Sequence, residues 1–497
     1  MRINSASTRH HFCKHSTIRS TVLAMAPAQL YFNKSRFKIG ISLVPLLLVT
    51  QVVSAQQVLP LKEALHLGIE NYGQLKAKAK YAAASKGDVE RARLDYLPDV
   101  NVSAQVAYGS ANGQNGPLYG FGSTGIASSG TPIGRQDWNA AFGSLYLTNV
   151  NWDFFAFGRS IQRIKTAEAV STRDEQDRLQ ELFQEQVRVA AAYLNLLAAQ
   201  RLTASYRRNL ERADTLRRII VQRAEQDLVP GVDSSQANAE VSNARTTLLQ
   251  AMDVEAEQND KLVELLGTPP TQITTDTLFV TTLPRSVPEQ DDSVLARHPL
   301  LEFYKSRVAV SDVQSRYYQT FSYPTFSLGG VFAGRGSGFG PITGQGTYAY
   351  SPDFFDGLHP ERVNYVLALG VTWNFTQPFR VRQQVRSQRL ISAGLRDEFD
   401  QLNQQLASRL LLAETKLRDA IADYRETPVQ VKAALDAWHQ KTVLYDNGLT
   451  NLVDVTQALY ALIRAETDRD IAFSNVWQAL LLKAGAIGDF TIFSQNL

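Results

Sequence analysis

Few residues of this 497-residue chain have the types and spacing that catalysis or metal binding requires. Beyond residue 55 there are four histidines, and none stands at ligand or catalytic-triad spacing from another: His66, His298, His359 and His439. The glycine-rich stretch 334–340 has spacing faintly like a nucleotide-binding loop, but no phosphate-binding helix is expected to follow it. We therefore interpret it as an ordinary loop, and we expect neither an enzyme nor a metal or other cofactor.

Two aspartates stand at positions that matter for charge. Asp233 and Asp454 each lie where a helix is expected to begin after a turn, over 226–233 and 447–454. A carboxylate there accepts free backbone N–H groups and favours the positive helix end, so simple capping explains these residues as well as a functional charge does.

The same two turns contain small or apolar residues where the end of a helical bundle has no need to show them. These are Leu228, Val229, Gly231, Gly448, Leu449 and Leu452. Exposed groups of this kind can mark a docking site for another protein. The alternative is that single residues among them fold back onto each other.

Long helices must position these turns. Spacings of three and four between apolar residues predict two helical hairpins, over about 159–266 and 380–487. The outgoing helices run over about 159–226 and 380–445, which at 1.5 Å per residue is roughly 100 Å. The first return helix has a polar break at Glu255 and Gln258.

Four segments alternate apolar with polar or small residues, as strands do when one side faces lipid and the other water. They cover about 98–109, 143–155, 324–334 and 364–376. The connections between paired strands are rich in glycine and aromatic residues and are as long as the external loops of outer-membrane barrels. Half-buried strands of a soluble sandwich are the alternative.

The chain repeats one plan twice. From Trp152 onward, one constant offset in residue number pairs Trp152 with Trp373, and Asp233 with Asp454. This unbroken register predicts an internal duplication. We expect a first structural repeat over 56–292 and a second over 293–497.

Residues 1–55 have the order of a secretory signal peptide: a basic stretch ending at Lys38, the apolar run 39–50, and small residues up to Ala55. The apolar run is short for a retained membrane anchor, which is the alternative. Translation could start at Met1 or at Met25. Removing the segment removes the only cysteine, Cys13, and changes the formal net charge from +3 to −4, so nucleic-acid binding is not expected.

Four strands cannot close a barrel, because open edges are intolerable in lipid. Two copies of the chain would make eight strands around a lumen filled by side chains, whereas three would make twelve around a passage. The smallest assembly with a pore is therefore a homotrimer, in which twelve long helices continue the barrel and meet a partner at their tips.

The mature chain resembles the TolC family of outer membrane efflux proteins over essentially its whole length. The segments that carry the resemblance are 61–71, Leu97-Pro98 before a strand, 152–159 and 448–458. It implies a mixed alpha and beta fold, with an outer-membrane beta-barrel of four strands per chain and twelve in total, continued by a periplasmic alpha-helical barrel. The implied function is the passive exit duct of a tripartite efflux or type I secretion system, spanning outer-membrane lipid. A periplasmic adaptor protein would open it at the tips and link it to an inner-membrane pump of RND or ABC type.

The resemblance also assigns residues at the aperture. Asp454 matches an aspartate that rings the periplasmic opening, and Tyr445 matches a tyrosine that latches the closed state. The partner arginine position is Thr450 and the second acidic position is Gln457, so both departures remove charge. We expect Asp233, Tyr445, Asp454 and Gln457 at the aperture, and Thr450 with the tip residues at the adaptor contact. An exported adaptor or other coiled-coil protein is the alternative function, although two hairpins and four strands argue against it; the long helices argue against a plain porin.

Overall fold

The computed structural model describes residues 58–113, 131–276, 279, 282–284 and 297–496. The predicted signal segment, with Cys13 and both candidate start methionines, lies outside these residues, as does much of the first predicted loop. Among the helices that are described, none is both long and apolar enough to cross a membrane.

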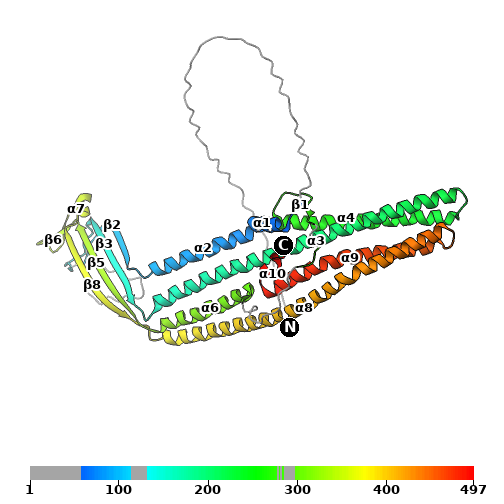
Figure 1. The fold of residues 1–497 in the computed structure, drawn as a ribbon. Helices are drawn as coiled ribbons and strands as arrows, with labels where there is room; N and C mark the ends of the chain where they lie inside the picture. Colours follow the sequence, from blue (N-terminus) through cyan, green and yellow to red (C-terminus); the bar gives the residue numbers. More distant parts are fainter. Residues whose placement is uncertain (1–57, 114–130, 277–278, 280–281, 285–296, 497) are drawn as a thin grey trace, which may run out of the picture. The chain divides into compact units, whose positions relative to one another are not determined.

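Each half of the chain supplies two long strands and one long helical hairpin (Figure 1), as the repeat predicted. The first half contains β1 (Val58–Leu59), α1 (Leu61–Asn71), α2 (Gly73–Leu94), β2 (Asp99–Ser110), β3 (Ala140–Phe155), α3 (Arg159–Glu225), α4 (Gly231–Leu266) and β4 (Thr274–Thr275). The second half contains α6 (Pro299–Gln319), the 3₁₀ turn η2 (Thr320–Ser322), β5 (Thr325–Ser337), β6 (Phe339–Ile342), β7 (Tyr348–Tyr350), α7 (Phe354–Leu358), β8 (Arg362–Thr372), α8 (Gln377–Asp446), α9 (Leu452–Ile487) and α10 (Thr491–Ser494).

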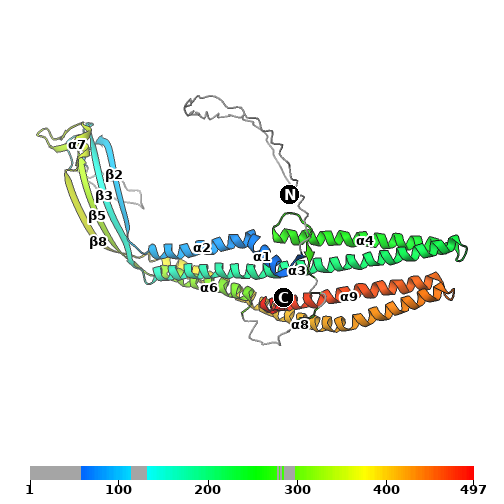
Figure 2. The same ribbon diagram turned by 45° about the horizontal axis from the view of Figure 1, so that its top comes forward.

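The four long strands form one antiparallel sheet in the order β2-β3-β5-β8, and Figures 1 and 2 show them side by side. Its register places the apolar residues of the two outer strands, β2 and β8, on the same face. Across one level, Val102 pairs with Thr148, Thr148 with Phe332, and Phe332 with Tyr365. The opposite face of β2 carries polar residues such as Ser103. The sheet therefore has one apolar and one more polar face, which is the pattern of a strand layer between lipid and water.

The outermost strands β2 and β8 each pair on one side only, within the part of the chain that the structure describes. Every residue of β2 is exposed, including Val102 at 78%, and so is Tyr365 of β8 at 78%. Unpaired backbone N–H and C=O groups next to exposed apolar side chains call for a further strand on each edge.

The connection between β5 and β8 is more ordered than the predicted loop. Its glycine-rich start lies in β5 and β6, and the short helix α7 packs on β3. The glycines permit this close packing, because a Cβ on Gly357 would lie 2.3 Å from the Phe142 carbonyl oxygen and one on Gly336 would lie 2.4 Å from that of His359. Interpreting residues 334–340 as a loop was therefore wrong in its local structure. The interpretation that they bind no nucleotide is unaffected.

Glycines end both return helices, as their positions in the sequence suggest. Gly267 (φ 62°) follows α4 and Gly488 (φ 84°) follows α9, both in the left-handed conformation that glycine adopts without strain. At each position a Cβ would also meet a neighbour, Asn71 at 2.9 Å and His298 at 2.6 Å. The His298 ring accepts the Leu300 N–H at the start of α6 and lies 3.2 Å from the Gly485 carbonyl oxygen, so it fixes α6 to the end of α9.

The largest apolar core joins α1, α3, α4 and α9. Tyr193 of α3 is fully buried; its hydroxyl donates to the Leu59 carbonyl and accepts the Asp276 N–H, both at 2.7 Å. Trp477 of α9 stacks edge-on against Phe279 at 5.0 Å. This core anchors the bases of both hairpins.

A charged cluster lies where α1 passes into α2. Glu181 accepts hydrogen bonds from Tyr72 (2.8 Å) and Arg188 (2.7 Å) and pairs with Lys78 (3.2 Å). One helical turn further along α3, Glu185 is fully buried, and the Arg188 guanidinium at 3.1 Å is its one cationic partner among the described residues. Burial raises the pKa of Glu185 above its usual value, because an ionised carboxylate loses its hydration there.

We predict that Glu185→Gln raises the melting temperature of the purified protein at pH 7.5. Because the folded-state pKa is raised, the stability that Glu185 contributes is complete below the unfolded pKa and is lost as pH rises through the folded pKa. The increase in melting temperature that the neutral amide gives should therefore become smaller toward pH 4. Calorimetry at both pH values tests this, with Glu175→Gln as a control on a more exposed carboxylate that Arg178 already pairs. A lower melting temperature for Glu185→Gln at pH 7.5 would contradict it.

Candidate gate at the helical tips

The two hairpins end in turns of the same backbone form. Leu228 N–H and Leu449 N–H each donate to the carbonyl five residues earlier, at 2.9 Å in both turns. The residues before them, Asp227 (φ 56°) and Gly448 (φ 72°), adopt the left-handed conformation that closes such helix ends. Each position is separated from its counterpart by the same offset as Trp152 from Trp373, so the repeat extends to the backbone of the turns.

The two aspartates do not cap the return helices. Asn451 does so for α9, since its side chain accepts the Asp454 N–H at 2.9 Å. Pro230 precedes α4 and has no capping side chain. Asp233 and Asp454 both stand third in their helices, where the helix dipole still favours a negative charge. The side chains of both make other contacts, so the capping interpretation was wrong.

Asp233 and Tyr445 are brought together from the two hairpins. The Tyr445 hydroxyl donates to the Asp233 carboxylate at 3.0 Å, and the Tyr445 side chain is buried. Burial, followed by the hydrogen bond to Asp233, raises the pKa of Tyr445 to about 12. A phenol with a raised pKa stabilises the fold below its unfolded pKa of 10 and loses that contribution only as pH rises through 12, so this link is intact at physiological pH.

Around this hydrogen bond lies a small apolar cluster that also spans both hairpins. It consists of Ile220 and Ala237 from the first and Tyr445, Leu452 and Val455 from the second. Further from the tip the hairpins are joined by charges, with Arg212 and Glu466 in a two-pronged pair at 2.6 and 3.1 Å. We call the Tyr445–Asp233 hydrogen bond and this cluster the tip latch.

Asp454 is held within its own hairpin. Its Oδ2 accepts from the Lys441 ammonium at 2.9 Å and from the Thr450 hydroxyl at 2.8 Å. The Lys441 ammonium, followed by the Thr450 hydroxyl, holds the pKa of Asp454 below its usual value. Gln457 is exposed one turn further along α9.

The predicted apolar tip residues divide into exposed and buried ones. Leu228 and Leu449 are 67% and 74% exposed, and Gly231 and Gly448 are also exposed. Val229 is half-buried against the tip latch, and Leu452 is 2% exposed inside it, so expecting Leu452 at an exposed contact was wrong.

Two exposed residues were missed. Val232 and Val453, at 71% and 47% exposure, are counterparts at the same constant offset of the repeat. That offset, together with the exposed position of the second residue of a helix, is the signal that could have identified them.

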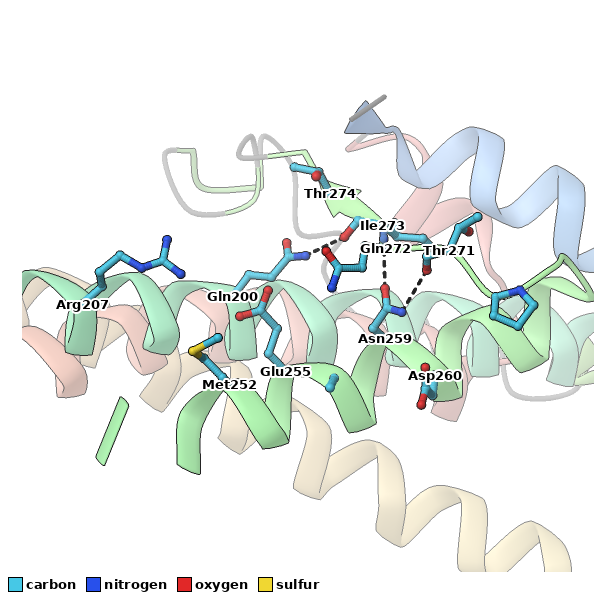
Figure 3. A pocket seen from close by; sticks show the side chains of 12 residues that line it. Gln200, Arg207, Met252, Glu255, Asn259, Asp260, Thr271, Gln272, Ile273 and Thr274 are labelled. Atoms are coloured by element: carbon cyan, nitrogen blue, oxygen red, sulfur yellow. Dashed lines mark hydrogen bonds between the residues drawn. The ribbon is translucent and has the colours of Figure 1, made fainter. Parts of the chain in front are cut away.

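A cavity of about 620 Å³ lies away from the tips, between α3, α4 and the segment 270–274 (Figure 3). Asn259 holds this segment by donating to the Thr271 carbonyl and accepting the Ile273 N–H, both at 2.9 Å, and Gln200 donates to the Ile273 carbonyl at 2.7 Å. Glu255, one residue of the predicted polar break, lines the cavity, so α4 here faces a space that it shares with α3 and a polar chain segment. No group of three or more metal-ligating side chains is found among the described residues.

We predict that Tyr445→Phe loosens the tips without unfolding the hairpins. Removing a hydroxyl that binds a carboxylate should cost about 1.5–3 kcal/mol locally, an increase of about tenfold or more in the opening equilibrium. Hydrogen exchange should therefore accelerate in 226–233 and 447–454. Tyr460→Phe is the matched control, because Tyr460 also joins the hairpins through a carboxylate, Glu240, but is 46% exposed. Equal exchange in both variants and the wild type would contradict the tip latch.

Comparison with known proteins supports the resemblance to outer membrane efflux proteins. Residues 64–268 match the family described as outer membrane efflux protein. Three solved structures share the fold over 86% of this chain. The channel OprN has a TM-score of 0.69 and 16% identity over 89% of its own chain. VceC from Vibrio cholerae has 0.68 and 15% over 96%, and CusC has 0.72 and 12% over 92%.

Identities this low establish the fold alone, and no curated protein matches the chain in sequence. The family match confirms the resemblance predicted from the duplicated motifs, and it confirms an outer-membrane efflux channel over an enzyme, an adaptor or a plain porin. Residues 64–268 therefore match the outer membrane efflux protein family, the TolC-like group of outer-membrane channels, and 86% of the chain shares the fold of such a channel.

Proposed function

We propose that three copies of this chain form the exit duct of a tripartite efflux or type I secretion system, through which cargo passes passively from the periplasm to the exterior. The observation that carries the proposal is the four-stranded sheet, which has one apolar face and two unpaired edges in the described residues. In lipid every backbone polar group needs a partner, so β8 of one copy pairs with β2 of the next. Three copies give a twelve-stranded barrel, the smallest with an open lumen.

The long hairpins continue this passage on the periplasmic side. Helix α3 has 67 residues and α8 has 70, which at 1.5 Å per residue is roughly 100 Å each. Six hairpins from three subunits would line one axis. The duct would thus reach from the outer membrane into the periplasm and meet its partner at the tips.

Opening would require the hairpins to part at their tips. The two hairpins of a chain meet there through the tip latch and, nearby, through the pair of Arg223 with Asp446 at 3.2 Å. These contacts are one small apolar cluster and two polar links, so a docking protein could exchange them for its own. The exposed residues Leu228, Val232, Leu449 and Val453 suit an apolar groove on a helical adaptor. The adaptor would connect the duct to an inner-membrane pump of RND or ABC type.

The first test is conductance. Purified protein reconstituted into planar lipid bilayers should produce discrete, long-lived single-channel steps, and Tyr445→Phe should produce larger or more frequent openings because the tip latch is weakened. The Tyr460→Phe control should behave as the wild type. A folded preparation without channel steps would contradict the proposed function.

The second test detects the shared barrel directly with cysteines. Ser103 of β2 lies on the polar face of the sheet, and the residues of β8 on that face include Asn364, Val366 and Ala368. Pairing cysteine at 103 with cysteine at each of these three positions should give, for at least one pair, disulfide-linked trimers on a denaturing gel. The matched control is cysteine at Leu367, whose side chain lies on the other face. Exclusively monomeric bands from every pair would contradict closure between copies.

A further inference from the structure

An ammonium group accompanies the aperture aspartate. Lys441 lies on the outgoing helix α8 and Asp454 on the return helix α9, so their 2.9 Å contact spans the tip turn of one hairpin. Their side chains are 43% and 38% exposed, so both charges reach solvent. The sequence alone does not predict this ion pair, because Lys441 lies before the turn and Asp454 after it.

We infer that Lys441 sets the ion selectivity of the periplasmic aperture by neutralising Asp454. The inference rests on the proposed function, a duct of three subunits, and on the expectation from the family resemblance that Asp454 of each subunit lies at its opening. Three bare carboxylates would form a negative ring that enriches cations and excludes anions. A carboxylate with an ammonium at contact distance acts instead as a dipole, whose field falls off faster than that of a single charge.

Two contacts hold Asp454 in place beside Lys441. The Thr450 hydroxyl donates to the same Asp454 oxygen at 2.8 Å, and Asn451 binds the Asp454 N–H at 2.9 Å. The carboxylate is therefore fixed toward Lys441 by its own turn. An exposed ion pair with fixed geometry is better populated than one between two freely rotating side chains.

One neighbouring tip charge is compensated in the same way, because Asp446, beside the tip turn, is paired with Arg223 at 3.2 Å. Asp233 receives the neutral Tyr445 hydroxyl. Gln457, one turn along α9 from Asp454, is uncharged. Among the described residues, Lys441 is the one cation in contact with the Asp454 carboxylate, since its other partner is the neutral Thr450 hydroxyl. Removing Lys441 would thus leave an uncompensated negative ring at Asp454.

Reversal potentials in planar bilayers under a potassium chloride gradient test the inference. The wild type should discriminate weakly between potassium and chloride. Lys441→Gln should raise the cation-to-anion permeability ratio by about tenfold, the lower end of the enrichment that focused fields produce. Asp454→Asn should shift the ratio toward anions, and the double variant should return to the wild-type value. Lys441→Arg keeps the charge and should change little.

Trimer mass and single-channel conductance are measured for every variant in the same preparations. Normal channels with an unchanged permeability ratio in Lys441→Gln would overturn the inference and leave the proposed function intact. A double variant that stays cation-selective would overturn it as well, because the pair would then not be the cause. Absence of channels in the wild type would instead overturn the proposed function.

Discussion

The structure depends on one constraint: the backbone polar groups at the edges of a sheet must find partners when the sheet enters lipid. A single chain satisfies this constraint for β3 and β5 but leaves the outer sides of β2 and β8 open in its described part. The apolar face with Val102 and Tyr365 favours the membrane, while the open edges prevent one copy from staying there alone. In the proposed duct, assembly is therefore part of folding, and the number of strands per chain determines how many copies give a passage.

The contacts between the two hairpins change from their bases to their tips. Each begins next to a strand of the sheet, and both share the core around Tyr193 and Trp477 near their bases. Toward the tips the apolar contact between the hairpins shrinks to the five-residue cluster around Tyr445, and polar links accompany it, namely the Arg212–Glu466 pair and the hydrogen bond of Tyr445 with Asp233. The bases are thus fixed by a large apolar core, whereas the tips are held by a small cluster and a few polar contacts that can be exchanged. This gradient suits a gate that opens at one end.

Periodicity predicted most of the fold because the helices and strands are long and the repeat pairs them at a constant offset. The four long strands, the hairpin ends and the stops at Gly267 and Gly488 all follow local rules of alternation, spacing and backbone conformation. The short helix α7 was missed because its order comes from contacts such as Gly357 against Phe142, which no local pattern reveals. Leu452 was misplaced for a related reason: its burial depends on the neighbouring hairpin packing over it.

The tip turns were predicted in their position, whereas the contacts of their side chains were not. The tip turns and their aspartates follow from the repeat, whereas the partner of each carboxylate depends on how the helices are rotated about their axes. That rotation brings Tyr445 to Asp233 and Lys441 to Asp454. Capping of α9 by Asn451 is instead a local contact, set by the residue that directly precedes the helix.

The central claim is that three copies share one barrel, and the detergent-corrected mass of the purified mature protein tests it most directly. Light scattering or analytical ultracentrifugation should give three times the mass of the single mature chain, with no smaller folded species. A stable, folded monomer or dimer in a detergent that preserves outer-membrane proteins would contradict the account.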